Sequence, residues 1–208
     1  MVIKIMDINR VFENKNSEIS KIFDFINSTL EEKKVFLKSL EIDGIELYED
    51  YYEYFIENIN FIEEVKVNFQ ILSELVRDTL HSSYEYIERA VPLIEALSNS
   101  FRKGPTEKSW NELENLFSGI EWILESYSNI DKYSNLNELI SNYYIWNEYV
   151  VEIEELRLTL KDFFDAVRNK DSVLISDILV YEINPIFQAM YEKLTKMNNK
   201  DVNIKDVN

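Results

Sequence analysis

The spacing of apolar residues changes near Gln70, from a period of two to a period of three to four. Before that position, the segment from Val2 to Ile5 alternates apolar and polar side chains, as a strand does. After it, apolar residues recur every three or four positions, which is typical of amphipathic helices. The change predicts a small α+β unit over residues 1–69 and a helical bundle over residues 70–197. The polar tail, residues 198–208, is expected to be disordered.

The first part is predicted to run strand, strand, helix, hairpin, short helix, strand. Its clearest signal is Asp43-Gly44 between two apolar runs, because both residues tolerate the positive φ of a tight hairpin turn. A last strand is expected where Val65, Val67 and Phe69 alternate with polar residues. This order resembles a ubiquitin-like (β-grasp) unit, in which one helix crosses a small mixed sheet. A βαββ sheet without the first hairpin is the alternative.

The second part is predicted to be an antiparallel four-helix bundle, with helices over about 71–102, 107–127, 136–169 and 172–197. Gly104-Pro105 ends the first helix and Thr106 caps the second. Pro92 and Pro185 lie inside helical patterns, where each removes a hydrogen bond, so a kink is expected at both. The stripe expected to be buried on the first helix is Leu72, Val76, Leu80, Ser83, Ile87, Ala90, Ile94, Leu97 and Phe101. The one expected for the third helix is Leu139, Tyr143, Trp146, Val150, Ile153, Arg157, Leu160, Phe164 and Val167.

Two stretches of the helical part resemble segments of small acidic proteins of Gram-positive bacteria. One is the run from Asp171 to Pro185, and the other is Gly119-Ile120-Glu121-Trp122. Those proteins form an uncharacterised family with a short α+β part followed by helices. The resemblance therefore implies the same two-part architecture for this chain, and it implies no activity.

Composition excludes several classes of function. The chain has 22 Lys and Arg and 39 Asp and Glu, which gives a net charge of −17. This negative charge disfavours nucleic acids and anionic membrane surfaces as partners. The chain has no cysteine and one histidine, His81, so thiolate sites and relays that need two histidines are excluded. Three glycines leave no room for a glycine-rich phosphate loop. We expect neither a metal nor a cofactor, and we expect no enzymatic activity.

Arg157 and Glu182 occupy positions where the helical pattern expects apolar residues. Both are equally far along the chain from the turn near residue 169, so an antiparallel hairpin would place them at the same height. A charge on a buried seam is costly unless it is paired. The pattern therefore predicts a buried Arg157–Glu182 pair that specifies the register. The alternative is a polar pocket in which Arg157 receives a ligand anion.

Aromatic residues are more numerous than one helical seam can bury, with 13 Tyr, 12 Phe and 3 Trp. Some of them lie beside acidic residues, and exposed Tyr and Trp contribute much of the energy at protein interfaces. They would otherwise pack the two parts of the chain together. The candidate interaction surface consists of Tyr51, Tyr52, Tyr54, Trp122, Tyr143, Tyr144 and Trp146.

These observations favour a non-catalytic protein–protein interaction module, an adaptor or a chaperone-like partner in a bacterial assembly. Its partner would be a protein, and a basic one if acidic rims attract it. A homodimer is also expected from aromatic helix faces. A small-molecule anion sensor at Arg157 is the alternative function. No uninterrupted apolar run approaches the ~20 residues of a membrane span, so a cytoplasmic location is expected.

Overall fold

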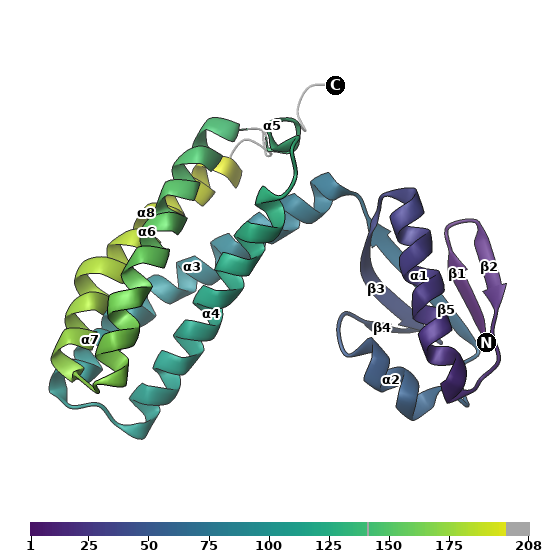
Figure 1. The fold of residues 1–208 in the computed structure, drawn as a ribbon, viewed down its shortest axis with the longest axis horizontal. Coiled ribbons are helices and arrows are strands. Elements are labelled where there is room, and N and C mark those ends of the chain that lie inside the picture. Colours follow the sequence, from purple (N-terminus) through teal and green to yellow (C-terminus); the bar gives the residue numbers. More distant parts are fainter. Residues whose placement is uncertain (141, 199–208) are drawn as a thin grey trace. The chain divides into compact units, whose positions relative to one another are not determined.

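The computed structural model describes residues 1–140 and 142–198, and these divide into two compact units, Met1–Leu75 and Val76 onward. The expected boundary at residues 69/70 precedes this division by less than two helical turns. In chain order the elements are β1 (Val2–Ile5), β2 (Ile8–Val11), the 3-10 turn η1 (Asn16–Glu18), α1 (Ile19–Lys33), β3 (Phe36–Ile42), β4 (Ile45–Leu47), α2 (Tyr51–Asn58), β5 (Glu64–Gln70), α3 (Leu72–Lys103), α4 (Glu107–Asp131), α5 (Leu136–Leu139), α6 (Tyr143–Arg168), α7 (Ser172–Ile178), the π-helical segment η2 (Leu179–Ile183) and α8 (Asn184–Asn198) (Figure 1). Of the expected tail, residues 199–208 lie outside the described part.

The N-terminal unit is a five-stranded mixed sheet in the order β2-β1-β5-β3-β4. Strands β1 and β5 are parallel, and the other neighbours are antiparallel. The hairpin between β3 and β4 turns at Asp43 and Gly44, both at positive φ as predicted. The fold class, a β-grasp-like unit before a mainly helical part, is confirmed, and the βαββ alternative is wrong because β1 pairs with β2.

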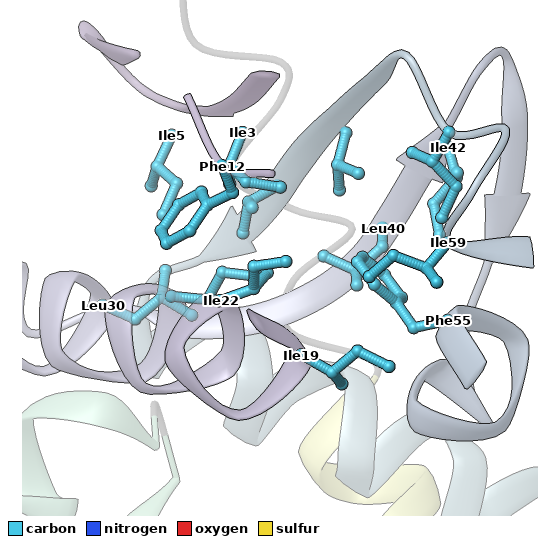
Figure 2. Close-up of a cluster of buried hydrophobic side chains, with 14 residues drawn as sticks. Ile3, Ile5, Phe12, Ile19, Ile22, Leu30, Leu40, Ile42, Phe55 and Ile59 are labelled. Atoms are coloured by element: carbon cyan, nitrogen blue, oxygen red, sulfur yellow. The ribbon is translucent and has the colours of Figure 1, made fainter. Parts of the chain in front are cut away.

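The core of this unit lies between one face of the sheet and helix α1 (Figure 2). Ile3 and Ile5 face it from β1, and Ile22 and Ile26 face it from α1. Phe69, expected on the same face as Val65 and Val67, is instead exposed. The pairing of β3 with β5 shifts between Leu37 and Ser39, where β3 has one extra residue, and at this end of β5 it is Gln70 that is buried.

The helical unit contains four long helical stretches: α3, α4, α6 and the continuous run α7-η2-α8 (Figure 1). Thr106 and Ser109 form a capping box at the start of α4, and Gly104 takes a positive φ after α3. The stripe expected on α3 is buried from Val76 to Phe101. Helix α3 runs through Pro92 as one element. The contacts that join neighbouring stretches are Phe101–Trp110 for α3 and α4, Phe117–Phe163 for α4 and α6, Lys193–Glu148 for α6 and α8, and Tyr84–Tyr191 for α3 and α8.

The α7-η2-α8 run is interrupted where Pro185 removes a backbone donor. Just before the proline, the Asn184 N–H bonds to the Leu179 carbonyl, one residue further back than in an α-helix. A single wide turn therefore accommodates the proline without ending the helix.

One helical stretch of the described chain, Ser172–Met197, is long and apolar enough to cross a bilayer by length and composition. Counting only uninterrupted apolar runs missed it, because Asp177 and Glu182 interrupt the stretch. Half of its apolar window is buried inside the bundle, and the core helix of a soluble bundle meets the same criterion.

Candidate interaction sites

The aromatic residues expected at the surface of the N-terminal unit are only partly exposed. Tyr51 and Tyr54 on α2 pack against the sheet core, and the Tyr51 hydroxyl donates to the Tyr48 carbonyl at 2.6 Å. Tyr52 is half exposed and lies against Phe23, with 5.8 Å between ring centroids. Most of this cluster therefore covers the core.

The aromatic residues of α6 separate into an exposed group and a buried one. Tyr143 and Tyr144 are exposed, but Trp146 retains only 1% of its accessible surface. Its indole ring lies 5.7 Å from the Tyr127 ring and 5.8 Å from the Tyr149 ring. Including Trp146 in a docking surface was wrong. Trp122 on α4 is 39% exposed, as a surface residue should be.

The predicted buried Arg157–Glu182 pair is also wrong, because both residues are exposed. The guanidinium of Arg157 bonds to Glu154 at 2.8 Å, on its own helix. It also lies over the Tyr127 ring, 5.3 Å from the centroid. Arg157 therefore faces α4, and the hypothesis of an anion pocket around it loses its structural basis.

The error concerned the face of the helix. The buried stripe of α6 runs through Trp146, Tyr149, Ile153, Leu156, Leu160 and Phe163. The predicted stripe began at Leu139, which belongs to the separate helix α5. Several of its later members therefore fell on a face of α6 that is turned away from the buried one. Residues 155 and 159 of α6 do lie beside Glu182, so the height along the hairpin was right.

Glu155, Thr159 and Glu182 line a hollow of about 230 Å³ between α6 and the wide turn of η2. We call it the acidic hollow. Three of its lining side chains are the carboxylates Glu152, Glu155 and Glu182. The remaining lining residues are Thr159, Tyr181, Pro185 and Ile186.

The carboxylates of the acidic hollow have no ion-pair partner among residues 1–140 and 142–198. Burial raises the pKa of Glu152, and the negative charges of Glu155 and Glu148 raise it further, while the positive charge of Lys193 opposes part of this rise. Thr159 is 9% exposed, and its hydroxyl has no hydrogen-bond partner in the described chain. The hollow therefore holds carboxylates that form no ion pair and a hydroxyl without a hydrogen bond in the described chain.

Three exposed apolar side chains, Tyr181, Val151 and Leu158, lie at or beside this hollow, and we call them the apolar rim. Tyr181 lines the hollow and is 68% exposed. Val151 and Leu158 lie four residues before and three residues after Glu155, which places them beside it on the helix surface. Leu158 is 77% exposed and Val151 is 62% exposed. A partner that bound at the hollow would cover these apolar groups.

A second candidate site is a cavity of about 480 Å³ between α3 and α4, which we call the α3–α4 groove. Its lining is mainly apolar and includes the buried residues Ala90, Ile94, Leu97 and Leu116. The polar groups that line it belong to Tyr86, Arg89, Glu112 and Asn115. Its volume is in the range of small-molecule sites.

His81 does not contribute to either site. Its side chain is exposed on α3, 3.5 Å from Glu85 and beside the Tyr84 ring. In the part of the chain that the structure describes, no three His, Asp or Glu residues are grouped so as to hold a metal ion. The acidic hollow is included in that statement.

A family model described as Domain of unknown function (DUF8042) matches residues 78–193, more than half of the chain. The chain belongs to this family. The matched region begins two residues into the helical unit and contains every lining residue of the acidic hollow and of the α3–α4 groove. No curated protein and no solved structure matches the chain.

Sequence analysis singled out Glu182 but missed the other members of the acidic hollow. Glu152, Glu155 and Tyr181 look like ordinary solvent-facing residues until the helical phase of α6 is known. The exposed stripe Tyr144, Val151 and Leu158 has a seven-residue spacing that could have revealed it. The groove left no such signal, because it depends on how far apart α3 and α4 lie.

Proposed function

We propose that this protein is a non-catalytic interaction module and that its acidic hollow receives a Lys or Arg side chain of a partner protein. The single observation that carries the proposal is the group of three carboxylates without an ion pair that line one hollow, with exposed apolar side chains on one side of it. Carboxylates offer only acceptors, and the cationic side chains of proteins offer only donors. The two are complementary at this site.

The energetics favour a cationic partner. The negative charge of Glu155 disfavours the charged form of Glu152 in the free protein, and an inserted cation would replace that repulsion with charge-assisted hydrogen bonds. The hydroxyl of Thr159 supplies one more acceptor. Burying the apolar rim adds the non-directional part of the binding free energy. The net charge of −17 also accelerates encounter with a basic partner at low salt.

The same features disfavour the other expected partners at this site. A second copy would bring its own acidic hollow against this one, so homodimerisation there is opposed by charge. A phosphate-bearing nucleic acid would be repelled in the same way. An anion sensor would need a free cation, whereas Arg157 is held by Glu154.

The bacterial and cytoplasmic setting remains part of the proposal. Burial of half of the apolar window of Ser172–Met197 favours a helix of the bundle over a membrane span. An adaptor or chaperone-like role would follow from the identity of the partner.

The test compares capture by three versions of the full chain: wild type, Glu155→Gln/Glu182→Gln, and the control Glu114→Gln/Glu125→Gln, which changes the same charge on the exposed surface of α4. Bound proteins are identified by mass spectrometry at low and raised salt. We expect a protein that wild type and control retain, that the hollow variant loses, and that raised salt releases.

Identical capture by the hollow variant and by wild type would contradict the proposal. If raised salt did not release the captured protein, the proposal that charge attraction contributes to binding would be contradicted. Because Glu155 and Glu182 are exposed, neither substitution should unfold the chain, and circular dichroism checks this.

A further inference from the structure

The α3–α4 groove combines an apolar floor with unused hydrogen-bond donors. Arg89 lines the groove, and its guanidinium has no ion-pair partner in the described residues, although acidic residues outnumber basic ones across the chain. Asn115 and the Tyr86 hydroxyl also have no hydrogen-bond partner there. Glu112 differs, because Lys108 lies 3.5 Å from its carboxylate.

Tyr86 lies at one side of this groove in a position that Gly119 makes available. A Cβ at residue 119 would overlap the Tyr86 ring and hydroxyl. The Trp122 ring lies 6.4 Å from the Tyr86 ring. Partial burial raises the pKa of Tyr86, so its phenol remains a neutral hydrogen-bond donor at physiological pH.

We propose that the α3–α4 groove binds an amphipathic carboxylate, a small molecule with an apolar body and one anionic head. The apolar body would cover Ile94, Leu97 and Leu116, and Leu93, which is 65% exposed, would fold over it. The carboxylate would accept hydrogen bonds from Arg89, whose planar guanidinium matches a carboxylate in a bidentate geometry.

Charge complementarity identifies the head group of this ligand. Among the lining residues of the described groove, Arg89 is the only cationic side chain. The only carboxylate in the lining, that of Glu112, already has Lys108 nearby. A cationic or dianionic head would therefore be less well matched than a single negative charge. This site is separate from the acidic hollow, so either proposal can fail without the other.

Isothermal titration calorimetry with decanoate, below its micelle concentration, tests the site. Decan-1-ol is the matched probe with the same apolar body and no charge. The variants are Arg89→Gln, which removes the charge, and Ala96→Phe, which fills the groove from an exposed position. Arg77→Gln is the control, since Arg77 is an exposed arginine of α3 that lies outside the groove lining and pairs with Asp78.

We expect wild type and Arg77→Gln to bind decanoate more tightly than decan-1-ol. Arg89→Gln should lower the decanoate affinity by about tenfold and leave decan-1-ol binding unchanged, as loss of one charge-assisted interaction implies. Ala96→Phe should weaken both probes.

Three results would overturn the proposal. The first is no decanoate binding by the folded wild-type chain, and the second is equal decanoate affinity for wild type and Arg89→Gln. The third is a dimer in sedimentation velocity that Ala96→Phe dissociates, because a second copy would then fill the groove.

Discussion

The Tyr86 side chain of α3 occupies the space that a side chain at residue 119 of α4 would need. A glycine in the middle of a helix normally costs stability, because it loses more conformational freedom than alanine does. Here the missing Cβ allows the Tyr86 phenol of α3 to pack directly against the backbone of α4 at Gly119. Gly119 is therefore explained by packing, and its backbone need not adopt a left-handed conformation.

This contact makes the effect of Gly119→Ala depend on residue 86. In the wild type, we expect Gly119→Ala to destabilise the chain because the tyrosine must leave its site. In a Tyr86→Ala background, the same substitution should stabilise it by about 0.5–1 kcal/mol, the ordinary helix-propensity gain. Urea unfolding of the four proteins measures the coupling. The same sign in both backgrounds would contradict the contact.

The sequence predicted those elements whose local signals agree with their packing. The Asp43-Gly44 turn, the Thr106 cap and the α3 stripe each depend on residues close together in the chain, and all three are observed. The phase of α6 could not be predicted in the same way. The helix begins only at Tyr143, and apolar side chains occupy both its core face and its exposed face.

The candidate sites were harder to predict than the fold. Height along a hairpin follows from counting residues, which predicted Glu182 at the height of Arg157; in the structure residues 155 and 159, on either side of that position, line the same hollow as Glu182. Which side of the helix a residue occupies changes by about 100° per residue. A shift of one residue in the predicted stripe is therefore enough to assign a surface arginine to the core. The groove depends on the separation of α3 and α4, which no local pattern encodes.

Trp146 and Tyr144, two residues apart on α6, should respond very differently to truncation. Trp146→Ala removes a buried ring packed against Tyr127 and Tyr149, so we expect a loss of about 3–5 kcal/mol. Tyr144→Ala removes a ring that is 72% exposed and should change stability by no more than about 0.5 kcal/mol. Chemical denaturation gives both values. Similar losses would mean that the indole is not in the core.

Ser98 on α3 and Ser176 on α7 form a buried polar contact between the two helices. The Ser98 hydroxyl lies 2.9 Å from the Ser176 carbonyl, to which it donates, and 3.0 Å from the Ser176 hydroxyl. Ser98→Ala leaves both Ser176 oxygens without this partner, so we expect a cost of about 1–3 kcal/mol. The double alanine variant should cost less than the sum of the single variants. Additive losses in a double-mutant cycle would show that the hydroxyls are not coupled.

The acidic hollow should lower the stability of the free protein in a pH-dependent way. Because burial and Glu155 raise the pKa of Glu152, the folded chain keeps that proton to a higher pH than the unfolded chain does. As pH rises above the usual glutamate range, near 4.3, the folded state therefore loses stability until the raised pKa is passed. Glu152→Gln removes this penalty. It should raise the melting temperature at pH 7 and leave it unchanged at a pH below the usual range.

Thermal unfolding of wild type and Glu152→Gln across this pH interval measures the effect, with the exposed Glu114→Gln as the matched control. The variant that gains stability should also bind the basic partner more weakly, since it loses one of the carboxylates that line the hollow. Such a trade between stability and binding is expected where like charges are kept close together for a ligand. A Glu152→Gln chain that is less stable than wild type at pH 7 would show that a positive charge of the chain already neutralises the Glu152 carboxylate. Glu152 would then stabilise the fold and would not be held ready for a partner's cation.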